Sequence, residues 1–126
     1  MVMEKAKEID FYDLYWHDSV VKNILINRTE PGVIDTITFE IKWPDNQLKF
    51  LVFEDVYWAD LNLNFGFHGS DTIYDADILG KDDPDIVNFY ARHKGHLDHI
   101  KLIGYCIISN SMIKILAKGF KLMESI

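Results

Sequence analysis

Cysteine, proline and long apolar runs are all scarce in this chain. Cys106 is the only cysteine among 126 residues, so no disulfide can form within the chain and a four-cysteine zinc site is excluded. The prolines Pro31, Pro44 and Pro84 each stand beside glycine or aspartate, so we expect them in turns or at a helix start. No apolar run reaches the roughly 18 residues of a membrane-spanning helix, and residues 1–8 lack the apolar core of a secretory signal. We therefore expect a soluble, cytoplasmic protein.

The chain has the length and composition of one ordered domain. Single domains commonly contain about 100 to 150 residues, and 126 residues are too few to form two domains that each have a hydrophobic core. Hydrophobic residues make up 48% of the chain and aromatic residues 13%, which is enough to form a sizeable core. We expect a single domain over residues 1–126.

The net charge of −7 is concentrated in the middle of the chain. Residues 54–85 contain nine acidic residues and one basic residue, whereas residues 86–126 contain two acidic and six basic residues. An acidic surface repels the phosphates of nucleic acids and anionic lipids, and it attracts basic proteins or cations. The alternative is that these acidic residues only keep the protein soluble.

Hydrophobic and polar residues alternate through much of the chain, as in strands with one buried face. A β-rich run begins near Val20, and residues 37–43 show the clearest alternation. Residues 48–53 are apolar on both faces, which is typical of a central strand. Residues 57–67 alternate again, and we expect a bend at residues 54–55 to separate these two strands.

Helical signals are few. Residues 83–94 have apolar residues at helical spacing, with Asp83 as the expected cap, and residues 4–15 predict a short amphipathic helix. Residues 72–79 could form one helical turn, and residues 100–108 and 112–123 predict a C-terminal hairpin. Short connections favour antiparallel pairing. The expected fold is α+β: a mainly antiparallel sheet of five to six strands, with a short N-terminal helix and a helical insertion before the hairpin.

The step His17-Asp18-Ser19 follows Trp16 and precedes the first β-rich run. His17 could act as a general acid or base with Asp18 setting its tautomer, because imidazole titrates near neutral pH. Adjacent side chains in a strand point apart, however, so we do not expect these two to pair. The structural alternative, which we favour, is that Asp18 or Ser19 bonds to the backbone at a helix-to-strand junction while His17 packs on Trp16 or Tyr15.

A small metal-dependent hydrolase is the enzymatic alternative. Its polar site would consist of His17, Asp18, Asp55 and His68, with Asp60 as a further carboxylate. The sequence contains no calcium-binding loop, phosphate-binding glycine loop, nucleophile elbow or helical zinc motif. We therefore favour a protein that is not an enzyme, and we expect no catalytic residues, no metal and no cofactor.

Trp58 is expected on the polar face of the strand over residues 57–67, beside Asp60 and Asn62. An aromatic residue surrounded by polar groups is a favoured anchor of a protein interface, but the helix predicted near residues 84–94 could cover this face instead. The sequence leaves both alternatives open. The predicted partner-binding residues are Trp58, Asp60, Asn62, Asp71, Asp75 and Asp77.

The opening motif also carries a resemblance. An aromatic residue, then His17-Asp18-Ser19, then the spaced aliphatic residues Val21, Ile24 and Ile26 resemble the start of small bacterial uncharacterised domains with the pattern aromatic, His-Asp-Ala/Ser, β-strand. The motif is similar to that of some immunity proteins of polymorphic toxin systems, over about the first quarter of the chain. The resemblance implies a cytoplasmic, non-enzymatic protein that neutralises a toxin by covering its active surface.

These observations predict a protein-binding domain, of immunity type if the resemblance holds, whose acidic middle region binds a basic protein such as a toxin. We expect neither nucleic acid nor a membrane as partner. A subunit of a homo-oligomer is compatible with every residue named above.

Overall fold

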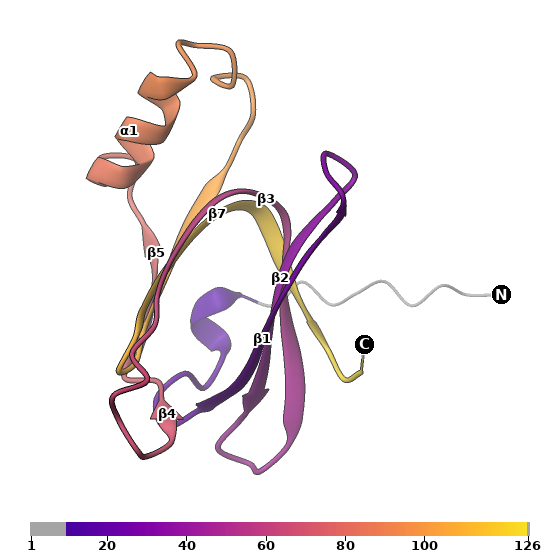
Figure 1. Ribbon diagram of the computed structural model, residues 1–126, viewed down its shortest axis with the longest axis vertical. Coiled ribbons are helices and arrows are strands. Elements are labelled where there is room, and N and C mark those ends of the chain that lie inside the picture. Colours follow the sequence, from indigo (N-terminus) through magenta and orange to yellow (C-terminus); the bar gives the residue numbers. More distant parts are fainter. Residues whose placement is uncertain (1–9, 126) are drawn as a thin grey trace, which may run out of the picture.

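Seven strands, one α-helix and one turn of 3₁₀ helix make up residues 10–125, the part of the chain that the computed structural model describes (Figure 1). In chain order the elements are η1 (Phe11–Asp13), β1 (Val20–Glu30), β2 (Ile34–Lys42), β3 (Leu48–Asn62), β4 (Asp71–Thr72), β5 (Asp75–Leu79), α1 (Pro84–Arg92), β6 (Ile103–Ile108) and β7 (Met112–Met123). All strand pairs are antiparallel, in the order β4-β1-β2-β3-β7-β6-β5. The predicted antiparallel sheet is confirmed, but it has seven strands instead of five or six.

The additional strands come from residues 72–79, where the prediction of a helical turn is wrong. Ala76 is buried between the exposed residues Asp75 and Asp77, which is the period of a strand. The backbone N–H of Ile73 donates to the carbonyl of Ser19 at 2.7 Å, and that of Tyr74 donates to the carbonyl of Ile108 at 2.8 Å. These short strands therefore tie the β1 side of the sheet to the β6 side, and the sheet curls (Figure 1).

The hydrophobic core lies on the concave side of this curl. Phe39, Phe53 and Tyr105 project into it, and η1 fills it from the N-terminal side with Phe11, which is 1% exposed. Trp16 is buried against Phe11, with ring centroids 4.7 Å apart, and its Nε1 donates to the Phe11 carbonyl at 2.7 Å. Residues 4–9 of the helix predicted over residues 4–15 lie outside the described residues, and the helical part of residues 10–15 is the single turn η1.

β3 is one strand of 15 residues where the sequence predicts two. The expected bend is present as a bulge: Asp55 has φ of 51°, and the register with β7 shifts between Val56 and Trp58. β7 pairs with β3 on both sides of the bulge, so the strand continues through it. The expected extension to residue 67 is wrong, because the strand ends at Asn62 and the following residues are exposed.

The predicted helix and hairpin are confirmed, with small changes in their bounds. The Asp83 carboxylate accepts from the N–H of Asp85 at 3.0 Å, and Pro84 occupies the first turn of α1. Lys94 and Gly95, with φ of 49° and 85°, redirect the chain soon after the helix ends. No helix within residues 10–125 combines the length and apolarity needed to cross a bilayer.

The backbone of Asp55 generates a stability prediction. A left-handed conformation costs a residue with a Cβ about 1–2 kcal/mol, and asparagine and aspartate tolerate it best. We expect Asp55→Gly to equal or exceed the wild type in free energy of unfolding, Asp55→Asn to match it, and Asp55→Val to lose about 1–2 kcal/mol. Urea denaturation measures all three. Equal stability of the glycine and valine variants would contradict the positive φ.

Candidate functional site

The register of the sheet brings most of the predicted binding residues onto its outer, convex face. Cross-strand neighbours share a face, and β3, β7, β6 and β5 lie next to one another in that order. Three rows of neighbours cross these strands: Trp58, Leu116, Gly104 and Leu79; then Asp60, Lys114, Cys106 and Asp77; then Asn62, Met112, Ile108 and Asp75. Five of the six predicted residues therefore share this face.

Helix α1 covers the first row. Of the two alternatives for Trp58, the structure therefore has the one in which the helix covers this part of the face. Ile86 and Phe89 of the helix form an apolar cluster with Leu116, and the partly buried Trp58 packs against it. The helix approaches the sheet closely at Gly104, where an added Cβ would lie 2.5 Å from a methyl carbon of Ile86. Trp58 is thus a packing residue more than an exposed anchor.

Lys114 fastens the start of the helix to the sheet. Its Nζ lies 3.1 Å from Asp83 Oδ2 and 2.9 Å from Asp85 Oδ2, and the Asp83 side chain is only 12% exposed. Burial raises the pKa of Asp83, but hydrogen bonds from Lys114 and from the backbone of Asp85 and Ile86 outweigh it and hold that pKa below its usual 3.8. Lys114 was not predicted as a site residue, although it is the one charged residue in the apolar run 112–117.

The part of the outer face beyond Lys114 is open. Asp60, Asp75 and Asp77 are exposed there, and none of them forms an ion pair with another described residue. Between them lie Met112, which is 47% exposed, and Ile108, which is 36% exposed. We call these five residues the acidic face.

Cys106 lies beneath the acidic face and is buried. Burial raises the pKa of its thiol above the usual 9.0, so the reactive thiolate is disfavoured at neutral pH. Cys106 is therefore a packing residue, as its apolar surroundings in the sequence indicate.

Asp71 does not belong to the acidic face. It lies in β4, opposite Val21 of β1, at the other side of the sheet from Asp60. Its Oδ1 is buried and has no hydrogen-bond partner among the described residues. Asp71 and Asp75 are only four residues apart, but Asp71 pairs with β1 and Asp75 pairs with β6, so the two residues belong to different ends of the strand order.

The residues of the alternative enzymatic site are dispersed. His17 and Asp18 lie at the entrance to β1, Asp55 lies at the bulge of β3, and His68 lies in the loop before β4. Within residues 10–125, no three His, Cys, Asp or Glu side chains come together as a metal site. No observation in this part of the chain favours the hydrolase.

His17 and Asp18 are nevertheless closer than predicted. His17 Nε2 lies 3.6 Å from Asp18 Oδ1, because Asp18 takes a φ of 70° in a turn instead of a strand. Both side chains are about three-quarters exposed, so His17 does not pack on the aromatic residues. Ser19 makes the side-chain hydrogen bond to the backbone that was expected at the helix-to-strand junction. Its buried hydroxyl donates to the Tyr15 carbonyl at 2.6 Å.

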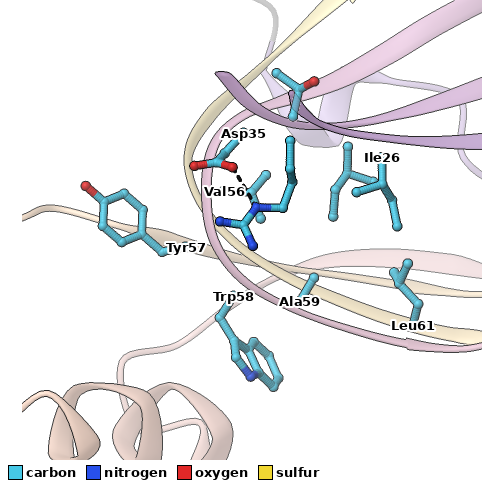
Figure 2. A pocket seen from close by; sticks show the side chains of 10 residues that line it. Ile26, Asp35, Val56, Tyr57, Trp58, Ala59 and Leu61 are labelled. Atoms are coloured by element: carbon cyan, nitrogen blue, oxygen red, sulfur yellow. Dashed lines mark hydrogen bonds and ion pairs between the residues drawn. The ribbon is translucent and has the colours of Figure 1, made fainter. Parts of the chain in front are cut away.

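Sequence reasoning also missed a cleft on the concave side, shown in Figure 2. Its volume is about 340 Å³, and it opens between the β1–β2 hairpin and the second half of β3. Ala59 and Leu61 point into it toward Ile26, whereas Trp58 points away toward the helix (Figure 2). The lining residues are Ile26, Arg28, Asp35, Thr36, Ile37, Val56, Tyr57, Trp58, Ala59 and Leu61.

An internal ion pair lies at one wall of the cleft. Arg28 Nε donates to Asp35 Oδ1 at 2.8 Å, and the backbone N–H of Gly32 donates to Asp35 Oδ2 at 2.9 Å. These two bonds lower the pKa of Asp35. Arg28 and Asp35 neutralise each other, so this wall of the cleft offers no unpaired charge to a ligand.

Comparison of the chain with models of protein families, with curated proteins and with solved structures found no match. The resemblance of residues 16–26 to immunity proteins therefore stays a prediction, and the functional argument depends on the geometry described above.

The Lys114 contacts generate a prediction about Asp83. Asparagine caps a helix as well as aspartate does, so Asp83→Asn removes only the ion pair, whereas Asp83→Ala removes the cap as well. We expect the alanine variant to be less stable than the asparagine variant by about 0.5–2 kcal/mol, measured by urea denaturation at neutral pH.

The same variants test the pH dependence. Because the pKa of Asp83 is lower in the folded state, its stabilising effect is complete above the unfolded value of 3.8 and is lost as the pH falls through the folded value. The wild type should therefore lose more stability than Asp83→Asn on acidification below about pH 4. Parallel pH profiles for the two proteins would show that the carboxylate contributes nothing.

Proposed function

We propose that this protein is a non-enzymatic binding domain that engages a basic protein partner through its acidic face. One observation carries the proposal: strands from distant parts of the sequence assemble Asp60, Asp75 and Asp77 around the exposed apolar residues Met112 and Ile108. An apolar centre with a charged rim is the usual arrangement of a protein interface.

The charge of this face supports a basic partner. Lys114 is the one basic side chain in the rows that contain the three acidic residues, and it is engaged by Asp83 and Asp85. The three carboxylates therefore act together on an approaching molecule. Complementary charge raises association rates and selects against acidic partners.

The immunity-type form of this proposal comes from the resemblance of the opening motif, and its partner would be a basic toxin. The motif itself lies at the start of β1, and its aromatic residue Trp16 is buried in the concave core. The motif therefore supports the fold, and the binding proposal depends on the acidic face.

A hexalysine peptide is a direct probe of the acidic face. We expect it to shift the NMR signals of Asp60, Asp75 and Asp77 in ¹⁵N-labelled protein, with an affinity that falls steeply as sodium chloride is added. Replacing Asp60 or Asp75 by asparagine should each weaken binding by about two- to fivefold, as expected for exposed charges.

Asp45→Asn is the matched control, because Asp45 is an exposed acid in the turn between β2 and β3. It should bind hexalysine like the wild type. Binding that does not depend on salt, or that Asp45→Asn weakens as much as Asp60→Asn does, would contradict the proposal.

A further inference from the structure

The edge of β3 that faces β2 loses its partner in the middle of the sheet. Pairing between β2 and β3 runs from Lys42 opposite Leu48 to Ile37 opposite Phe53, and it stops there. The other edge of β3 remains paired with β7 as far as Asn62. Within the described residues, no strand pairs with the β2-facing edge over residues 54–62.

The bulge and the length of β2 together explain this free edge. β2 begins at Ile34, which in the same register would stand opposite Val56, so residues 58–62 extend beyond the end of β2. β3 turns with β7 after Asp55, while the β1–β2 hairpin continues in its own direction to the turn at Gly32 (Figure 1). The two parts of the sheet diverge, and the cleft of about 340 Å³ lies between them. Beyond the bulge, residues 58–62 keep a regular register with β7, so their free edge is an ordinary strand edge.

The outer edges of the sheet differ from this internal edge in what they carry. At β5, the Tyr12 hydroxyl accepts from the backbone N–H of Ile78 at 3.0 Å and donates to Asp77 Oδ1 at 3.2 Å. At the opposite side, β4 pairs with β1 only at Val20 and Val21, so among the described residues the outer edge of β1 has no strand partner over residues 22–30. That edge strand carries the basic residues Lys22 and Arg28, and charged side chains discourage the addition of another strand. Residues 54–62 contain no proline or lysine, the residues that commonly block an edge against another strand.

We propose that an extended segment of the basic partner adds as a strand to the free edge of β3 at residues 58–62. Its backbone would pair with β3, and its inward side chains would enter the cleft between Ile26, Ala59 and Leu61. This inference rests on the proposed function, and it specifies how the partner is held.

Charge complementarity defines the segment. Its inward positions face an apolar cleft, and its outward positions lie beside Asp60, on the same strand. A segment that alternates aliphatic residues with lysine or arginine matches both faces. A second copy of this chain is a poorer occupant, because pairing two β3 edges would bring Asp55 and Asp60 of both copies together.

The probe is the peptide acetyl-Lys-Val-Lys-Val-Lys-Val-Lys-amide. It is compared with two modified forms: in one the backbone nitrogen of every valine is methylated, and in the other that of every lysine is methylated. Both methylated forms keep the charges and side chains, but each loses the backbone donors of one edge. We expect the parent peptide to protect alternate amides of residues 58–62 from hydrogen exchange. One methylated form should bind about tenfold more weakly than the parent, and the other should bind like it.

Ala59→Phe fills the cleft and should abolish this protection, whereas Ala91→Phe adds the same bulk to an exposed position of α1 and should not. The peptide comparison does not depend on whether the Ala59 variant folds. Equal binding of all three peptides, with shifts confined to Asp75 and Asp77, would overturn strand addition and leave the acidic face as the binding site.

Two further outcomes separate this inference from the proposed function. If neither the valine-lysine peptide nor hexalysine binds, both are wrong. If residues 58–62 are protected without peptide and sedimentation shows a dimer, the occupant is a second copy and the basic segment is wrong.

Discussion

The irregular segment of β3 from Asp55 to Trp58 is the constraint on which the rest of the molecule depends. If the pairing of β2 with β3 continued in the same register, it would end with Ile34 opposite Val56, because β2 begins at Ile34. The backbone of β3 turns at Asp55, and β7 turns with it. One edge of β3 therefore pairs with β2 over residues 48–53, and the other edge pairs with β7 over residues 50–62. The cleft follows from that change of direction, and the free edge follows from it together with the start of β2 at Ile34.

Lys114 marks the boundary between two parts of the convex surface: one part packs against helix α1, and the other part is open to solvent. On one side of Lys114, the helix buries Leu116 and part of Trp58. On the other side, the same strands expose Met112 and Ile108 among carboxylates. Lys114 forms ion pairs with both Asp83 and Asp85 at the boundary, so the helix is fixed without using the acidic residues of the open part. Asp60, Asp75 and Asp77 of the acidic face keep their charges free of ion pairs with other described residues.

Local patterns were sufficient for much of the fold. Alternation indicated β2, apolar β-branched runs indicated β6 and β7, and the Asp83-Pro84 pair indicated the start of α1. Pairing between distant strands could not be predicted, because it depends on the curl that β4 and β5 impose through the backbone of Ile73 and Tyr74. For the same reason Asp71 was grouped with Asp75, although two strands only a few residues apart belong to opposite sides of the sheet. The cleft left no signal except the expected bend near Asp55.

Amide hydrogen exchange of the free protein tests the central claim most directly. If β3 leaves β2 after Phe53, the amides of residues 50–53 are protected on both edges. Those of residues 58–62 should alternate between protected amides that bond to β7 and rapidly exchanging ones. Uniform protection of residues 58–62 in a monomeric sample would show that the edge is already paired, and it would contradict the account.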